Sequence, residues 1–202
     1  MTNRTMWLGV GVVWLAGCPE TKTPTEVNEE EVITTVQLDF TPAAGGDTVS
    51  FVWADPENDG NPVVDPITLA LDGQYAMAVS FLNELADPVE DITAEVNEES
   101  DQHQVFVLGS AVAGPATGTP AGAVVEHAYA DTDPNGLPVG LVNDITVLGA
   151  GSGTFEVVLR HLPPDGDVAV KVDGLAEQVA SGGFGSLPGA TDVDVTFDLT
   201  VE

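Results

Sequence analysis

Hydrophobic and polar residues alternate along most of the chain after Val32. Successive side chains of a β-strand point to opposite faces, so a period of two predicts strands with one buried face. The alternating positions are Val36, Leu38 and Phe40; Val49, Phe51 and Trp53; Tyr75, Met77, Val79 and Phe81; Val125, His127 and Tyr129; Phe155, Val157, Leu159 and His161; Val168, Val170 and Val172; and Val193, Val195, Phe197, Leu199 and Val201. Such strands, separated by turn residues, predict a mainly β fold: a single antiparallel β-sandwich domain over residues 32–202.

One segment, about 87–101, has helical spacing instead. Asp87 and Pro88 match an N-cap followed by proline at the first helical position. The apolar residues that follow share one helical face: Val89, Ile92 and Val96. The segment holds seven acidic residues and no basic one, which predicts a short acidic helix. The glycine-rich stretches 109–122 and 181–189 are predicted to be loops.

Composition narrows the class of protein. The 202 residues include 22 Gly and 14 Pro, which favours many turns and short strands, while 43% apolar content is too high for a disordered chain. With 33 acidic residues against 4 Lys and Arg, the net charge is −29, which argues against nucleic acid as a partner because phosphate binding needs clustered basic residues. A single Cys excludes an internal disulfide framework.

The first residues have the layout of a secretory signal peptide. Arg4 precedes an apolar run over residues 6–16, which is too short to span a bilayer. The run ends in Leu15-Ala16-Gly17-Cys18, which resembles the lipobox of bacterial lipoproteins. That resemblance implies cleavage before Cys18 and attachment of lipid to its sulfur. A plain secretory signal followed by an incidental Cys is the alternative.

The lipobox divides the chain into three parts. Residues 1–17 are predicted to be the signal peptide, residues 18–31 a lipidated Cys with a flexible acidic tether, and residues 32–202 the folded domain. The lipid anchor predicts attachment to a membrane of the cell envelope, with the outer membrane favoured and the domain facing the periplasm or the surface.

A short internal repeat is the most informative chemical motif. Residues 53–63 and 129–139 share the pattern aromatic-Ala-Asp-x-acid-x-(Asp/Asn)-Gly-x-Pro-Val. Oxygen-bearing side chains at alternate positions before a Gly resemble the opening of a Ca²⁺ loop. The candidate ligands are Asp55, Glu57, Asp59, Asp131, Asp133 and Asn135. An EF-hand is excluded because Pro66 and Val142 stand where its closing Glu would be, and hairpin turns without an ion are the alternative interpretation.

A second candidate site combines the acidic helix with the histidines. Asp87, Asp91, Glu95 and Glu99 form a ladder of like charges at a spacing of four, which His103 would continue. Carboxylate and imidazole groups together suit a divalent metal ion. The alternative metal ligands are therefore Glu95, Glu99, His103, His127 and His161. A solvated acidic face and buried structural histidines explain the same residues without a metal.

Three passages carry a second resemblance: residues 51–60, 81–106 and 159–163. They resemble small acidic bacterial lipoproteins, some of which carry the label "type 1 periplasmic binding fold". The label implies a large two-lobed α/β receptor. This chain lacks the repeated β-α alternation and the length of such a receptor, so neither its fold nor its ligand is expected here.

The chain shows no enzyme signature: it has no Gly-x-Ser-x-Gly or His-Glu-x-x-His motif, and the glycine-rich residues 149–154 lack the Lys of a phosphate loop. The sequence therefore predicts a non-enzymatic, envelope-anchored binding protein with divalent-cation loops, Ca²⁺ being the favoured ion. One alternative is an accessory lipoprotein that docks on an outer-membrane partner without a small ligand. Another is that the acidity reflects adaptation to high salt.

Overall fold

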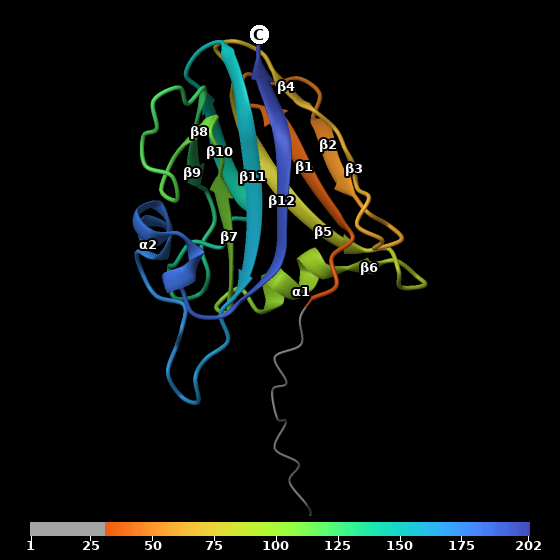
Figure 1. The fold of residues 1–202 in the computed structure, drawn as a ribbon, viewed down its shortest axis with the longest axis vertical. Helices are drawn as coiled ribbons and strands as arrows, with labels where there is room; N and C mark the ends of the chain where they lie inside the picture. The colour runs from red at the N-terminus through yellow and green to blue at the C-terminus, as the bar shows by residue number, and fades with distance from the viewer. Residues whose placement is uncertain (1–30) are drawn as a thin grey trace, which may run out of the picture.

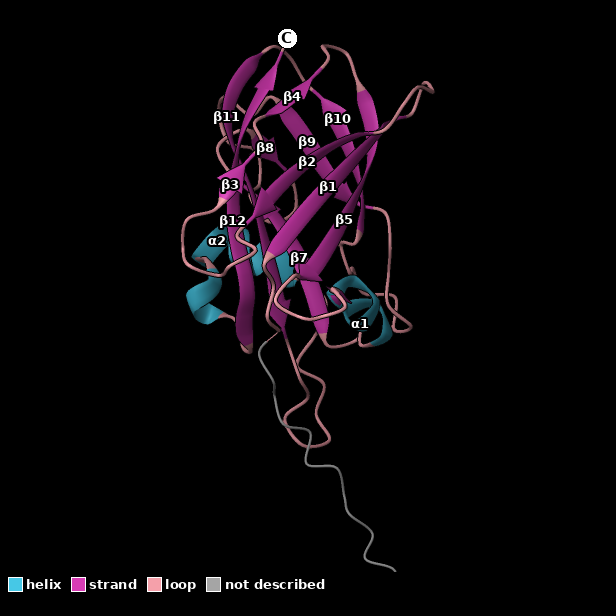
Figure 2. Ribbon diagram, turned by 90° about the vertical axis from the view of Figure 1, so that its right-hand side faces the viewer, coloured by secondary structure: helices cyan, strands magenta, loops and turns pink. Residues whose placement is uncertain are grey.

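The computed structural model describes residues 31–202. The lipobox residue Cys18, the signal peptide 1–17 and nearly all of the tether 18–31 lie outside the described residues. Two β-sheets pack face to face (Figure 1), which confirms the predicted mainly β sandwich. Both helices lie toward the end of the strands away from the C-terminus (Figure 2).

The larger sheet has eight strands and curls into a half-barrel. Their order is β3-β2-β1-β5-β10-β9-β8, and β6 pairs with β5. The strands are β1 (Thr35–Pro42), β2 (Val49–Ala54), β3 (Val63–Val64), β5 (Gln74–Asn83), β6 (Glu90–Asp91), β8 (Val112–Ala113), β9 (Val125–Tyr129) and β10 (Val142–Val147). Neighbours run antiparallel except for β8 and β9, which are parallel.

The smaller sheet has four strands in the order β4-β12-β11-β7. They are β4 (Ile67–Leu69), β7 (His103–Leu108), β11 (Gly151–His161) and β12 (Ala190–Val201). β11 pairs antiparallel with both β12 and β7, whereas the short β4 runs parallel to β12.

The predicted alternation places apolar side chains between the sheets. Phe40 on β1 and Phe155 on β11 meet edge to face with ring centroids 6.3 Å apart, and both are buried. Phe81 and Phe197 are also completely buried in this core. Burying a side chain of this size contributes about 1.5–3 kcal/mol through the hydrophobic effect, so the sandwich core is the main source of stability.

A second apolar cluster covers the outer face of the smaller sheet. Leu175 and Val179 of helix α2 (Leu175–Gly182) pack in one cluster with Phe106 and Val158 of the sheet, and the 3₁₀ helix η1 (Phe184–Ser186) follows α2. The sequence prediction had one helix and missed α2. The helix is only eight residues long, and its N-cap Gly174 makes no side-chain hydrogen bond, so few start signals mark it.

Helix α1 (Ile92–Glu98) is shorter than the predicted 87–101. Glu90 and Asp91 still pair with β5 as β6, which keeps the chain extended past the predicted start at Asp87. The side chain of Asp91 accepts the Thr93 N–H at 3.1 Å, so Asp91 is the N-cap. The like-charge ladder is therefore broken, because Asp87 lies outside the helix.

The strand predicted over Val168, Val170 and Val172 does not form. Val168 makes one isolated bridge with Asp165, and the side chains of Val168 and Val172 are exposed. The residue between the valines, Lys171, is buried instead. The predicted alternation is not kept here: Val170 is half-buried against the second apolar cluster, and its neighbour Lys171 is buried in an ion pair.

Candidate metal centre

Two histidines face each other across neighbouring strands of the smaller sheet. His103 begins β7 and His161 ends β11, and the two residues are register partners. Their rings stack with centroids 4.5 Å apart and an interplanar angle of 12°. His103 is 0% exposed and His161 is 6% exposed, so both imidazoles are removed from solvent.

The turn between α1 and β7 adds a carboxylate to this histidine pair. Glu99 is the C-cap of α1, four residues before His103. One ligand atom from each of Glu99, His103 and His161 lies within 4.8 Å of the others, and Glu99 reaches solvent. Within residues 31–202 this is the group of three or more His, Cys, Asp or Glu side chains that is close enough to hold one metal ion. We name it the Glu99–His103–His161 cluster.

The hydrogen bonds of His103 leave one ring nitrogen available. Nδ1 lies 3.1 Å from the backbone oxygen of Glu99, and a carbonyl oxygen only accepts, so the bond assigns the proton to Nδ1. Nε2 then carries the lone pair, and it has no hydrogen-bond partner among residues 31–202. Metal-ligating histidines commonly donate their other ring N–H to a carbonyl in this way.

His161 is even less satisfied. Neither Nδ1 nor Nε2 has a hydrogen-bond partner within the described part of the chain. Most buried polar atoms in proteins are paired, and an orphaned one calls for an explanation such as a bound ion or water. Three orphaned ring nitrogens in two stacked imidazoles therefore point to a ligand.

Both imidazoles are neutral at pH 7, which is the form that binds metals. Burial lowers the pKa of His103 to about 4, although its bond to the Glu99 carbonyl acts in the opposite direction. Burial also lowers the pKa of His161, against the attraction of the Glu99 carboxylate. Metal binding at this cluster therefore needs no loss of protons at neutral pH.

Carboxylates surround the cluster. Burial, together with the negative charges of Glu95, Asp192, Glu99 and Glu90, raises the pKa of Glu31 to about 7. These groups come from the start of the domain, from β6 and α1, and from β12. The negative potential that they create favours a cation at this end of the sandwich.

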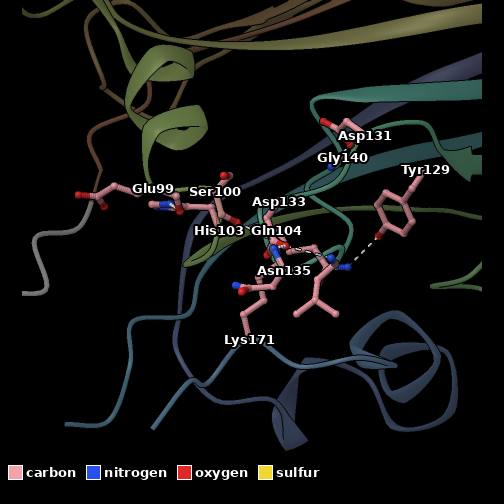
Figure 3. A network of polar contacts seen from close by, with 11 residues as sticks. Glu99, Ser100, His103, Gln104, Tyr129, Asp131, Asp133, Asn135, Gly140 and Lys171 are labelled. Atoms are coloured by element: carbon pink, nitrogen blue, oxygen red, sulfur yellow. Dashed lines mark hydrogen bonds and ion pairs between the residues drawn. The ribbon is translucent and has the colours of Figure 1, made fainter. Parts of the chain in front are cut away.

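A buried ion pair lies beside the cluster (Figure 3). The Lys171 ammonium lies 3.0 Å from Asp133 Oδ2, and the two side chains are 1% and 0% exposed. Lys171 Nζ also donates to the backbone oxygen of Ser100 at 2.7 Å, in the turn between Glu99 and His103. Asp133 Oδ1 accepts the N–H groups of Asn135 and Leu137, while Oδ2 faces the ammonium.

Another predicted ligand of this loop, Asp131, also binds backbone groups. Its carboxylate accepts the N–H groups of Gly140, Leu141 and Val142 at 2.7–3.0 Å. These bonds fasten the loop to the start of β10. Asn135 is exposed and contributes its backbone N–H to Asp133.

In the first loop, Asp55 is 4% exposed and accepts the N–H groups of Asp59 and Gly60. Asp59 accepts from Asn61, and Glu57 is exposed. The structure does not bring the three acidic side chains of the first loop into one group of metal-ligand spacing. The geometry shows two hairpin turns held by carboxylates, and the Ca²⁺ site in them stays a prediction.

The alternative set of metal ligands is brought together only in part. His127 lies on β9 in the larger sheet, where its Nε2 is 2.8 Å from Asn143 Oδ1 and its ring packs edge to face on Tyr129. Glu95 lies on α1 among the surrounding carboxylates rather than in the three-ligand group. The sequence analysis did not identify Lys171 as the partner of Asp133. Its position between two valines of an alternating run was the available sign that it is an unusual lysine.

Comparisons with protein-family models, curated proteins and solved structures found no match to this chain. Within residues 31–202, neither helix has the length and apolar character needed to cross a membrane.

Proposed function

We propose that this protein is a non-enzymatic, lipid-anchored protein of the cell envelope that binds a divalent transition-metal ion through Glu99, His103 and His161. One observation carries the proposal: a ligand atom from each of the three residues lies within 4.8 Å of the others, and three of the four ring nitrogens of the two buried histidines lack hydrogen-bond partners in the described chain. The lipobox sequence ending at Cys18 supports the anchor.

The ligand types favour a transition metal over Ca²⁺. Imidazole nitrogen suits Zn²⁺, Cu²⁺ and Ni²⁺, whereas Ca²⁺ takes six to eight oxygen ligands. Two histidines and one carboxylate form a set found at zinc sites that keep an open coordination position. Water or a neighbouring carboxylate would complete the coordination of the ion.

A titration on a soluble form of the mature chain, residues 19–202, tests the proposal. This form keeps every described contact. Thermal unfolding is followed in EDTA and then with Zn²⁺, Cu²⁺, Ni²⁺ or Ca²⁺ at fixed ionic strength. An ion at 100 times its dissociation constant adds about 2.7 kcal/mol to the free energy of unfolding. We expect a transition-metal ion to produce this shift and Ca²⁺ to produce little.

Two ligand variants and one control localise the effect. His103→Gln and His161→Gln should each abolish the ion-specific shift. Glu98→Gln removes an exposed charge from the same helix and should retain it. A shift that survives both histidine variants, or the absence of any ion-specific shift, would reject the proposal and favour an accessory lipoprotein that docks on a protein partner. Stabilisation by monovalent salt alone would instead support adaptation to high salt.

A further inference from the structure

Lys171 stands out among the described residues because it is a buried lysine on a segment without regular structure. It is 3% exposed, in a chain where acidic residues outnumber basic ones 33 to 4. Removing an ammonium from water is costly unless it is paired and hydrogen-bonded. Lys171 meets this condition with two partners, Asp133 at 3.0 Å and the Ser100 carbonyl at 2.7 Å.

The Ser100 carbonyl belongs to the short turn that joins two of the metal ligands. The Gln102 N–H donates to the Glu99 carbonyl at 2.8 Å, which closes the turn. The Gln102 carbonyl in turn accepts the Leu162 N–H at 2.6 Å, directly after His161. The turn is thus bonded on one side to the strand of the third ligand and on the other side to Lys171.

We propose that Lys171 is a positioning residue of the metal centre: by holding the Ser100 carbonyl it sets the placement of Glu99 relative to His103. This inference rests on the proposed function. Charge-assisted hydrogen bonds are short and strong, and 2.7 Å is typical of them. Metal ligands must be held to within about 0.5 Å, and changes in the groups that orient them typically lower metal affinity 10- to 100-fold.

The position of Asp133 extends the linkage to the hairpin loop between β9 and β10. Asp133 Oδ1 accepts two N–H groups of that loop, while Oδ2 pairs with Lys171. A continuous chain of contacts therefore runs from the loop through the ion pair to the turn of the metal centre (Figure 3). In this proposal, the ion pair between Lys171 and Asp133 preorganises the metal centre.

Two double variants separate positioning from folding. Lys171→Met with Asp133→Asn removes both buried charges at once and deprives the Ser100 carbonyl of its donor. Lys171→Gln with Asp133→Asn is equally neutral but keeps an N–H group able to reach that carbonyl. Urea unfolding in EDTA reports whether each variant is folded before metal is added.

The readouts are Zn²⁺ affinity by competition titration and the visible absorption spectrum of the Co²⁺-substituted protein. We expect the Met variant to lose about 10-fold or more in affinity and to show a changed Co²⁺ spectrum, and the Gln variant to recover most of both. Wild-type affinity and spectrum in the Met variant would overturn the positioning role while leaving the proposed function intact. If the wild-type protein binds no ion, the proposed function fails and the positioning role fails with it.

Hydrogen exchange on the wild-type protein gives a second test that needs no variant. Zn²⁺ should slow amide exchange at residues 99–103 and also in the loop 133–137, which carries none of the ligands. Protection confined to the ligands and their immediate neighbours would contradict the linkage through Lys171.

Discussion

The two hairpin loops that share one sequence pattern differ in what their carboxylates bind. Residues 53–63 connect β2 to β3, and residues 129–139 lead from β9 toward β10, both in the larger sheet. Both loops turn at a glycine with positive φ, 82° at Gly60 and 81° at Gly136. This region of φ is accessible to glycine without strain, so the shared glycine takes the same backbone conformation in both loops. The hydrogen-bonded turns nevertheless differ, because Asn58 N–H donates to the Asp55 carbonyl, whereas Gly136 N–H donates to the Asp133 carbonyl.

The matched acidic residues of the two loops differ in their partners and in their burial. Asp55 accepts N–H groups of its own loop, whereas the matching Asp131 reaches the return strand. Glu57 is exposed, whereas the matching Asp133 is buried against Lys171. A repeated local sequence therefore predicts the glycine conformation but not the partner of each carboxylate, because the partner can come from elsewhere in the chain.

The largest expected difference between the loops comes from removing the matched acids Asp133 and Glu57. Asp133→Ala leaves the Lys171 ammonium buried without its counter-charge, and breaking a buried pair in this way costs about 3–5 kcal/mol. Glu57→Ala removes an exposed side chain and should change the free energy of unfolding by about 0.5 kcal/mol or less. Urea unfolding in EDTA measures both, and equal effects would contradict the assigned burial.

Acid should sharpen the same comparison. Burial alone would raise the pKa of Asp133, but the N–H groups of Leu137 and Asn135 and the Lys171 ammonium lower it below its usual value. A carboxyl whose pKa is lower in the folded state stabilises the fold above its unfolded pKa, and this contribution is lost as the pH falls through the folded value. Below about pH 4, Asp133→Asn should therefore flatten the loss of stability seen in wild type. Urea midpoints between pH 2 and 6 give the measurement, and parallel curves for the variant and wild type would count against it.

The smallest expected effect concerns the first loop alone. Asp55→Ala removes the acceptor of two backbone N–H groups, but their residues Asp59 and Gly60 are exposed, so water can replace part of the loss and we expect about 1–2 kcal/mol of destabilisation. Asp59→Ala, which removes contacts to Asn61 only, is the matched control and should cost less. Trp53 lies two residues before Asp55, so its fluorescence follows the loop in both variants. A cost above that of Asp133→Ala would reverse the order of the two loops.

Several features followed from the sequence because their causes are local. Val36, Leu38 and Phe40 were predicted to be buried from their period of two, and the structure buries all three. This prediction needs only the residues of one strand, because alternation by itself identifies which face of the strand is apolar. The turns at Gly60 and Gly136 followed from glycine's access to positive φ. The helix between β6 and β7 was also foreseen from Ile92 and Val96, although its ends were wrong.

Other features were decided by tertiary structure alone. The register between strands β7 and β11 places His103 opposite His161. These strands are far apart in the sequence, so the spacing of residues along the chain could not predict this register. Lys171 lies in the interior because Asp133 and the Ser100 carbonyl meet there, and this buried lysine interrupts the valine alternation that predicted a strand. The local pattern thus determined which side chains are buried in strands and turns, whereas long-range pairing determined which buried polar groups meet, because a charge is stable in the interior only where the fold supplies its partner.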